Sequence, residues 1–234
     1  MSISVFFPAY NDSQTIPRLV KGVIKTLKKI TKDYEVIIVN DGSKDNTAAV
    51  AEELSRKYKN VRVVHHRTNK GYGAALKTGF KSSTKDFVFY TDGDAQYDVK
   101  ELEKLVGNLG DADVVNGYKL KRSDDLYRVV LGRLYHWGAK MLFNIRLRDI
   151  DCDFRLIRRK VFDKISLESN SGVICVEMMK KIQNAGFKIV EIPVHHYPRE
   201  SGSSQFFKLK RLIPVFTGLF KQWLKIVVIK NFRK

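Results

Sequence analysis

The chain has 234 residues, enough for one full-sized hydrophobic core, and its 44% hydrophobic content with 14 phenylalanines excludes a disordered protein. Its 43 basic and 25 acidic residues give a formal net charge of +18, which indicates an anionic partner such as a nucleotide, a nucleic acid or acidic lipid headgroups. Two cysteines, Cys152 and Cys175, fit neither a metal-ligand spacing nor a disulfide framework and indicate a reducing compartment.

The first half of the chain alternates short β-rich runs with longer segments of helical periodicity. We predict strands at Ile3–Phe7, Glu35–Val39, Val61–His65, Phe87–Thr91 and Asp113–Asn116, and helices at Thr15–Ile30, Asp45–Tyr58, Ala74–Lys81 and Val99–Leu109. Asp45 and Asp98 are typical of residues at helix starts. Such alternation predicts an α/β fold whose mostly parallel sheet has helices on both faces.

From about Lys119 the pattern changes. We predict a helix at Leu126–Phe143, a polar segment at Asp149–Arg155, a helix around Val173–Asn184 and a strand at Lys188–Pro193. No internal repeat or low-complexity linker interrupts this part of the chain. We therefore predict one catalytic domain over residues 1–204, followed by a basic amphipathic C-terminal extension over residues 205–234.

Polar residues follow four successive predicted strands, in the segments Pro8–Asp12, Asn40–Ser43, His66–Tyr72 and Asp92–Gln96. Ligands of parallel sheets bind beyond the carboxyl ends of the strands. The sequence therefore places a binding site at this edge of the sheet.

Asp92, Asp94 and Gln96 form the most informative of these patterns. If the strand continued, alternation would point the three side chains the same way. Two converging carboxylates repel each other unless a cation lies between them, and hard ions such as Mg²⁺ or Mn²⁺ prefer oxygen ligands that include substrate phosphates. The alternative is a strand-terminal turn, for which Asp and Gly are common residues.

Two other strand-end segments each allow two interpretations. Asp41 is placed to bind a sugar hydroxyl or a base N–H, or else it belongs to an ordinary turn. The glycines within Asn69–Ala75 would let the backbone pass close to a ligand or to a neighbouring element. For His65 and His66 we predict packing rather than catalysis.

The segments around Asp149 and Arg199 also allow two interpretations each. Asp149, Asp151 and Asp153 would share one side of an extended segment, as a second metal site or a source of a base, or they form a polar loop paired with nearby arginines. Arg199 lies in a Gly/Ser-rich loop that could close over phosphates, and the alternative is an interdomain linker.

The C-terminal extension is basic and amphipathic, since no Asp or Glu follows Glu200. Its apolar residues recur at three- and four-residue steps: Phe206, Leu209, Ile213, Phe216, Phe220, Trp223 and Val227. This predicts a helix in a membrane interface, with packing on the core as the alternative. The start of the chain reads as a strand, and no apolar stretch reaches the roughly 18 residues of a membrane span. We expect a cytoplasmic protein that is peripheral on the membrane.

Six segments together resemble the family 2 glycosyltransferases, which have a GT-A (Rossmann-like) fold. They are Pro8–Asp12, Val39–Ser43, Asn69–Gly73, Asp92–Gln96, Asp149–Arg155 and Arg199–Ser204, and they occur in the family's order. Within the family, the chain is most similar to the dolichyl- or polyprenyl-phosphate mannosyl- and glucosyltransferases.

This resemblance implies an inverting, metal-dependent hexosyltransferase that uses a nucleotide-sugar of the GDP-mannose or UDP-glucose type and a lipid-phosphate acceptor. It implies nucleotide-sugar contacts at Pro8, Tyr10, Asp12, Val39, Asp41, Lys70, Gly71, Asp92, Gly93, Asp94 and Arg199. It further implies Mg²⁺ or Mn²⁺ at Asp92, Asp94 and Gln96, acceptor-phosphate contacts at Lys119, Arg128 and Arg133, and catalytic roles for Asp92, Asp94, Arg199, Asp149 and Asp151.

The chain departs from the family pattern at a few positions. Asn40 replaces a common Asp, Asp12 a common Glu and Gly93 a common Ala; Asp153 stands where many relatives have Gly, and Gln205 where many have Lys. Many prokaryotic relatives also carry a C-terminal transmembrane pair that this sequence lacks. We therefore expect it to reach a lipid acceptor through its basic tail or through a small membrane partner subunit.

Three alternatives remain. The acceptor could be a sugar hydroxyl of a polysaccharide or glycolipid, which would require Asp149 or Asp151 as a base. A nucleic-acid-binding protein would explain the charge, but the sequence has no nucleic-acid module and its tail mixes basic with apolar residues. A catalytically idle binding subunit is disfavoured by the intact pair Asp92 and Asp94.

Overall fold

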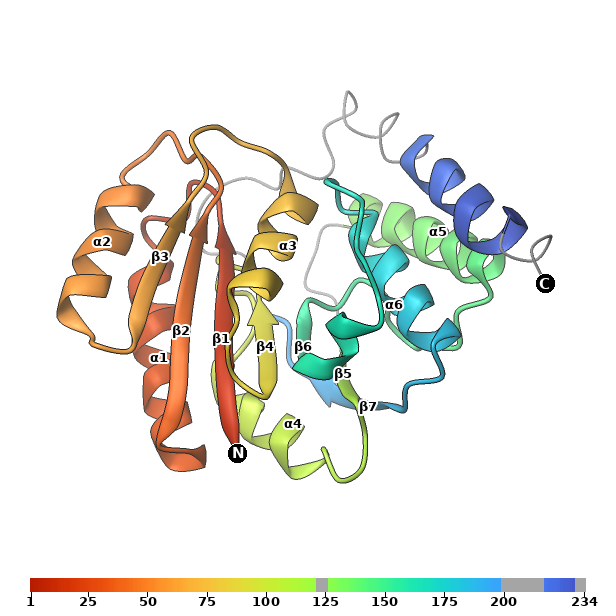
Figure 1. Cartoon of the computed structure of the whole chain (residues 1–234). Coiled ribbons are helices and arrows are strands. Elements are labelled where there is room, and N and C mark those ends of the chain that lie inside the picture. Colours follow the sequence, from red (N-terminus) through yellow and green to blue (C-terminus); the bar gives the residue numbers. More distant parts are fainter. Residues whose placement is uncertain (121–125, 199–216, 230–234) are drawn as a thin grey trace.

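The computed structural model describes residues 1–120, 126–198 and 217–229, and within these ranges one seven-stranded sheet carries helices on both faces (Figure 1). Its strands are β1 (Ser2–Ala9), β2 (Asp33–Asn40), β3 (Val61–His65), β4 (Phe87–Thr91), β5 (Val114–Lys119), β6 (Phe154–Arg158) and β7 (Ile189–Val194), in the spatial order β3-β2-β1-β4-β6-β5-β7. Strand β1 pairs in parallel with β2 and β4, β2 with β3, and β5 with β7. The predicted mostly parallel α/β sheet is confirmed.

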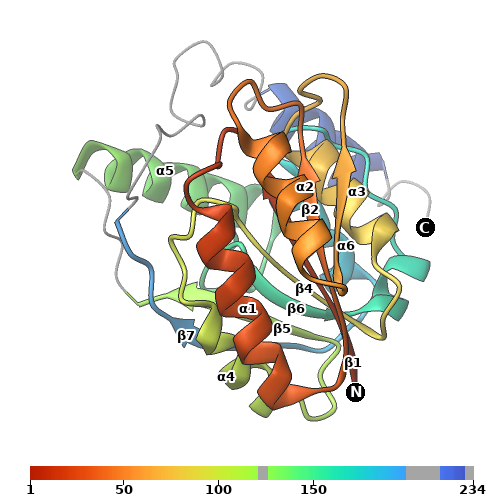
Figure 2. The same cartoon turned by 90° about the vertical axis from the view of Figure 1, so that its left-hand side faces the viewer.

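The helices lie on opposite faces of this sheet (Figure 2). They are α1 (Ile16–Ile30), α2 (Thr47–Lys57), α3 (Tyr72–Ser82), α4 (Leu102–Gly107), α5 (Leu126–Phe143) and α6 (Ile174–Asn184). Alternation along β1 explains the two cores: Val5 and Phe7 pack with α1, whereas Phe6 packs with α3. Each face of the sheet therefore has its own buried apolar cluster.

Strand β6 is the element that the sequence did not predict. It runs antiparallel between β4 and β5, so it joins the two parallel parts of the sheet. Its pattern was hidden because the second residue of the strand is Arg155, and this arginine is fully buried. Charged residues are almost never fully buried unless they are paired, so Arg155 masked a core strand.

The predicted helix starts are confirmed, but some boundaries differ. Asp45 accepts hydrogen bonds from Thr47 at the start of α2, and Asp98 caps a 3₁₀ turn at Val99–Glu101 that precedes α4. The continuous helix predicted at Val99–Leu109 is therefore wrong at its N-terminal end. Helix α3 begins at Tyr72 rather than Ala74, because Gly71 takes a φ of 97° immediately before it.

The described part of the C-terminal extension packs on the rest of the protein. Residues 217–223 are α-helical and Leu224–Ile229 form a π-helical segment. Leu219 and Ile226 are buried, and Lys225 forms an ion pair of 2.6 Å with Glu168. This matches the packing alternative for residues 217–229; the remaining residues of the extension, 205–216 and 230–234, lie outside the described ranges. None of the helices within those ranges is both long enough and apolar enough to span a bilayer.

Candidate functional site

The carboxyl ends of β1, β2 and β4 bring three of the predicted strand-end segments together, at the upper edge of the sheet in Figure 1. The Gly93 N–H donates to the Pro8 carbonyl at 3.1 Å, and the Asp41 N–H donates to the Ala9 carbonyl at 2.9 Å. The Thr15 hydroxyl donates to the Gly93 carbonyl at 2.5 Å. These bonds hold the ends of three strands in one fixed arrangement.

Asp92 and Asp94 lie in a turn rather than in a continuing strand. Strand β4 ends at Thr91, and Ala95 takes a positive φ of 59°. Asp92 accepts a hydrogen bond of 2.8 Å from the Tyr72 hydroxyl, and buried Asp94 accepts one of 3.2 Å from the Gln96 N–H. Strand alternation was therefore the wrong reason for grouping these carboxylates, although the turn keeps both at the same edge of the sheet.

Gln96, the third predicted metal ligand, faces another segment. Its side-chain amide nitrogen donates to the Tyr197 carbonyl at 3.0 Å, and the Tyr197 N–H donates to the Gln96 carbonyl at 2.8 Å. Gln96 thus ties the turn after β4 to the segment after β7.

Tyr72 was not singled out by the sequence, yet it contacts the Asp92 carboxylate directly. Burial raises the pKa of the Tyr72 phenol well above its ordinary value, and the negative charges of Asp153 and Asp92 raise it further. The phenol therefore stays protonated at neutral pH and remains a hydrogen-bond donor to Asp92.

Asp41 is buried and organises the loop that precedes α3. Its Oδ1 accepts a hydrogen bond of 2.9 Å from the Lys70 N–H and lies 2.6 Å from His66 Nδ1, and its Oδ2 accepts one of 3.0 Å from the Gly71 N–H. The other ring nitrogen of His66 lies 2.9 Å from the Thr78 hydroxyl. Packing of His66 is thereby confirmed, and Asp41 holds Lys70 and Gly71 beside the strand ends.

The glycines before α3 allow the close approach of a neighbouring element. A Cβ at Gly71 or at Gly73 would lie 2.4 Å from a carbonyl oxygen of the segment 169–171, and the Gly73 N–H donates to the Asn170 carbonyl at 2.9 Å. Of the two interpretations of these glycines, close packing against another segment is confirmed.

The turn after β1 is also tightly packed. Asp12 accepts a hydrogen bond of 2.8 Å from the Tyr10 N–H. A Cβ at Gly93 would lie 2.8 Å from the Pro8 carbonyl oxygen and 3.0 Å from Asp12 Oδ2, so glycine fits this position better than the common alanine. Val39 belongs to the buried core, which leaves only its backbone to contact a ligand.

Lys119, at the end of β5, lies against the loop that contains Asp149 and Asp151. Its ammonium nitrogen is 2.7 Å from the Asp151 carbonyl and 3.6 Å from Asp149 Oδ2. The same carboxylate accepts a hydrogen bond of 3.3 Å from the Lys119 N–H. The predicted phosphate-binding lysine and the two predicted acidic residues therefore form one cluster.

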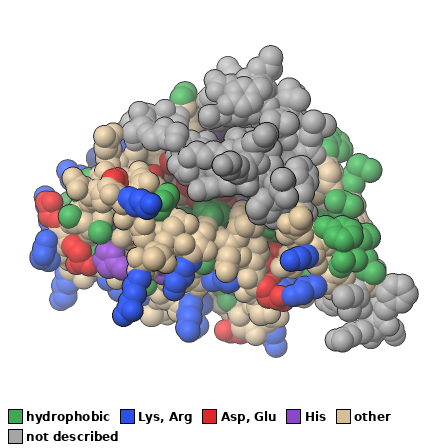
Figure 3. All heavy atoms as spheres, turned by 90° about the horizontal axis from the view of Figure 1, so that it is seen from above, with side chains coloured by type: hydrophobic (Ala, Val, Ile, Leu, Met, Phe, Trp, Pro, Cys, Tyr) green, Lys and Arg blue, Asp and Glu red, His purple; other side chains and the backbone are tan. Residues whose placement is uncertain are grey.

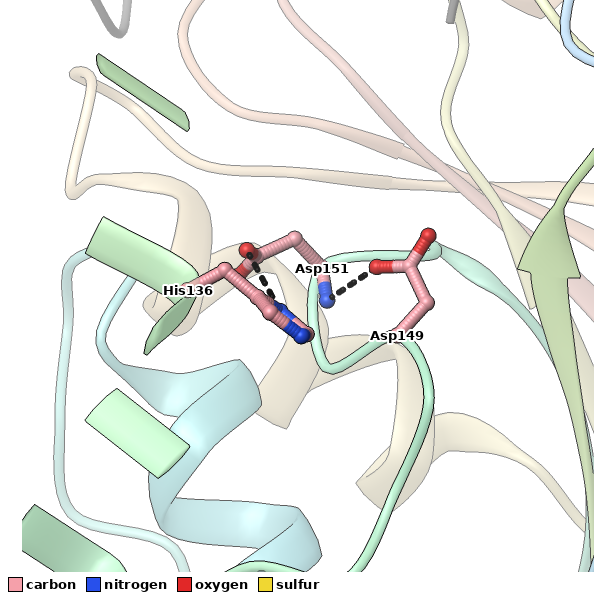
Figure 4. A group of neighbouring side chains, drawn as sticks. All are labelled: His136, Asp149 and Asp151. Atoms are coloured by element: carbon pink, nitrogen blue, oxygen red, sulfur yellow. Dashed lines mark hydrogen bonds and ion pairs between the residues drawn. The ribbon is translucent and has the colours of Figure 1, made fainter. Parts of the chain in front are cut away.

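His136 of α5 joins this cluster, and the sequence gave no signal for it. Its Nδ1 lies 3.9 Å from Asp151 Oδ2, and the Asp151 N–H donates to Asp149 Oδ1 at 3.0 Å (Figure 4). One ligand atom from each of the three side chains lies within 4.8 Å of the others. Because the Lys119 ammonium already brings positive charge to Asp149, this cluster resembles a proton-transfer or ion-pair site more than a metal centre.

Asp153 does not share a side with Asp149 and Asp151, because residues 149–153 form a loop instead of an extended segment. Its Oδ1 lies 3.3 Å from the guanidinium of Arg155 and accepts bonds from the Tyr90 hydroxyl at 3.4 Å and the Cys175 thiol at 3.2 Å. The prediction of three aligned carboxylates is wrong, and the alternative of an arginine pair is confirmed for Asp153.

Three predicted basic residues are not placed by the structure. Arg128 and Arg133 belong to α5, but their side chains lie outside the described part of the structure, as does the whole of Arg199. Their predicted phosphate contacts stay predictions.

Comparison with known sequences identifies glycosyltransferases as relatives of this chain. The family model "Glycosyl transferase family 2" matches residues 4–166. "Glycosyltransferase AglD" of Haloferax volcanii is 28% identical over 238 residues, which cover 97% of this chain and 38% of the relative. The chain thus spans well under half the length of that relative.

Solved structures of glucosyl-3-phosphoglycerate synthase from Mycobacterium tuberculosis are also similar. The complex with phosphoglyceric acid has a TM-score of 0.70 and 17% identity, with 96% of this chain and 79% of that chain covered. The complex with Mn²⁺ and UDP-glucose has a TM-score of 0.69 and 18% identity, with 96% and 78% covered. This similarity shows a shared fold.

Proposed function

Because the chain belongs to glycosyl transferase family 2, and is therefore a glycosyltransferase with a GT-A fold, we propose that it transfers a hexose from a nucleotide-sugar to a polyprenyl phosphate. The anomeric carbon is inverted in this reaction. The nucleotide-sugar is of the UDP-glucose or GDP-mannose type, and the protein acts at the cytoplasmic surface of a membrane, with or without a small membrane partner subunit.

The proposed acceptor rests on the link from Lys119, through Asp151 and His136, to α5, a helix whose outer side is apolar and exposed. Lys119 contacts Asp151, Asp151 pairs with His136 of α5, and the outer side of α5 exposes Trp137 and Met141, with 63% and 79% of their surface accessible. Figure 3 shows hydrophobic side chains on the side of the molecule where α5 and the C-terminal helix lie. A cation beside an exposed apolar surface suits an acceptor with a phosphate and a hydrocarbon chain.

Asp92 and Asp94 supply the hard oxygen ligands that suit Mg²⁺ or Mn²⁺, and both lie at the edge where the strands end. The mycobacterial structures of similar fold contain such ions together with UDP. We propose that these two carboxylates hold the ion, which would supply positive charge to the departing nucleoside diphosphate.

The remaining chemistry belongs to residues of the chain itself. A lipid phosphate is anionic at neutral pH, so it needs orientation by cations rather than deprotonation by a base. We propose that Lys119, with Arg128 and Arg133, orients the acceptor phosphate, and that Arg199 neutralises charge on the leaving group. Asp149 accepts the backbone N–H of Lys119 and thereby fixes the origin of the lysine side chain.

Replacement of Tyr72 by phenylalanine should lower kcat/KM for hexose transfer about tenfold, because a hydrogen bond to a charged group contributes about 1.5–3 kcal/mol. The hydroxyl of Tyr72 donates to Asp92 and thereby fixes the orientation of one proposed metal ligand. The expected signature is a raised requirement for Mn²⁺, measured by titrating the ion in the transfer assay. Tyr58→Phe, at the C-terminal end of α2, is the matched control and should change neither quantity.

A sugar hydroxyl is the second candidate acceptor, and one observation favours it. The pair His136 and Asp151 lies beside Lys119 and could accept the proton that a hydroxyl must lose. If the acceptor is a sugar hydroxyl, the Asp151→Asn variant should lose most of its transfer activity, and the remaining activity should not show the pH dependence of the wild type. If the acceptor is a lipid phosphate, the variant should keep its transfer activity.

The decisive experiment offers labelled UDP-glucose and GDP-mannose separately, with Mn²⁺ or Mg²⁺ and a short polyprenyl phosphate in detergent. Label that moves into an organic-extractable product, and stops when EDTA is added, supports the proposal and identifies the nucleotide-sugar. Metal-dependent hydrolysis of the nucleotide-sugar without a lipid product would contradict the proposed acceptor and favour the sugar hydroxyl.

A further inference from the structure

A groove of about 440 Å³ lies along α3, next to the loop that Asp41 holds. Its polar lining consists of Lys70, Lys77, Lys81, His66, Thr78 and Asn170. Lys77 and Lys81 are one helical turn apart on α3, and Ala74 leaves space before them because its side chain is small. Figure 3 shows Lys and Arg side chains along its lower edge, which is the side of the molecule where α3 lies.

The groove gathers the ammonium groups of three lysines. Within the described residues, no ion pair joins Lys70, Lys77 or Lys81 to an acidic side chain. Lys77 instead donates to two neutral acceptors, the Glu168 carbonyl at 2.8 Å and Asn170 Oδ1 at 2.6 Å.

The acidic residue whose backbone Lys77 contacts has other partners for its carboxylate. The Glu168 carboxylate lies 2.6 Å from Lys225 and 3.6 Å from Lys181, so its charge is directed away from the groove. The Asp41 carboxylate also lies beside the lining, but it is already bound to His66 and to the N–H groups of Lys70 and Gly71.

We propose that this groove is an anion site that binds a phosphate-bearing ligand away from the metal ligands Asp92 and Asp94, and that it shares Lys70 with the predicted nucleotide-sugar contacts. Like charges one helical turn apart destabilise a helix, and a bound phosphate would remove that repulsion. The amide nitrogen of Asn170 provides a neutral hydrogen-bond donor beside the ammonium groups. A free phosphorylated molecule and an anionic lipid headgroup offer the same chemistry to this site.

An anion in the groove would also act on the neighbouring loop. Lys70 lines the groove with its side chain, while its backbone N–H is bound to Asp41. Binding would therefore restrict the loop that carries Gly71 and precedes Tyr72, without contact to Asp92 or Asp94.

The test measures binding of inorganic pyrophosphate by calorimetry in EDTA, where Asp92 and Asp94 have no bridging metal and repel the anion. We expect the Lys77→Gln/Lys81→Gln variant to bind about tenfold more weakly than wild type, because two of the ammonium groups that would contact the anion are lost. The matched control is Lys21→Gln/Lys25→Gln, which removes two exposed lysines with the same spacing from α1 on the other face. It should bind as wild type does.

Two further measurements separate a binding defect from a folding defect and identify the source of the phosphate. The Lys77→Arg/Lys81→Arg variant keeps both charges and should bind pyrophosphate as wild type does. The Lys81→Gln variant leaves the contacts of Lys77 intact and should still bind pyrophosphate more weakly than wild type. Co-flotation is then measured with phosphatidylcholine vesicles that contain or lack phosphatidylglycerol. The site is assigned to a lipid headgroup if binding to the anionic vesicles, and not to the neutral ones, depends on Lys77 and Lys81. The proposal is overturned if the glutamine pair binds both pyrophosphate and anionic vesicles as tightly as wild type, or if wild type binds neither.

Discussion

An Asp94→Ala variant should lose hexose transfer by a factor of about 10³ while it keeps the fold. Asp94 is buried at 8% exposure in the turn after β4, where its carboxylate accepts the Gln96 N–H. With Asp94 gone, the proposed metal site would lose one of its two carboxylates, and the leaving group would depart with its charge poorly compensated. The measurement is kcat/KM for transfer at saturating Mn²⁺.

Two controls separate catalysis from structure. Asp94→Asn keeps the shape and one oxygen and should retain more activity than alanine, although far less than wild type. Asp111→Ala removes an exposed carboxylate that pairs with Lys188 away from the site, and it should have full activity. Full activity of Asp94→Ala, with a normal unfolding midpoint, would remove Asp94 from the proposed metal site.

The parallel part of the sheet was predictable because its strands are apolar on both faces and lie between helical patterns. Strand β1 is buried throughout and β2 over its last five residues, and such strands appear in a sequence as continuous hydrophobic runs. The position of the site followed from the same reasoning, since the polar residues after β1, β2 and β4 lie at one edge.

The features that could not be predicted from the sequence depend on contacts between residues that are distant in the chain. Arg155 is a strand residue because Asn116 and Asp153 satisfy it, and no local pattern shows that. His136 approaches Asp151 only because α5 folds over the loop. Tyr72 stands inside a recognisable glycine-rich segment, but its contact with Asp92 requires α3 to lie in front of β4, which is a property of the sheet order.

The largest effect on stability should come from Arg155→Met. Arg155 is fully buried, and its guanidinium donates to the Asn116 side chain at 2.6 Å, to the Tyr90 hydroxyl and to the Ile150 carbonyl, while pairing with Asp153 at 3.3 Å. Methionine fills part of the volume but leaves these acceptors without a donor and the carboxylate without its counter-charge. Breaking a buried pair in this way costs about 3–5 kcal/mol, which corresponds to a Tm lower by about 10 °C.

The neighbouring arginine of the same strand provides the control for this substitution. Arg158 donates to the Ala112 and Gly110 carbonyls and lies over the Phe87 ring, but it is only partly buried, so Arg158→Met should cost about 1 kcal/mol. Addition of Asp153→Asn to Arg155→Met should recover part of the loss, since it removes the uncompensated charge, and a double-mutant cycle measures that coupling. Equal Tm values for Arg155→Met and Arg158→Met would mean that the buried guanidinium does not hold β6 between β4 and β5, and that apolar packing alone keeps the two parallel parts of the sheet together.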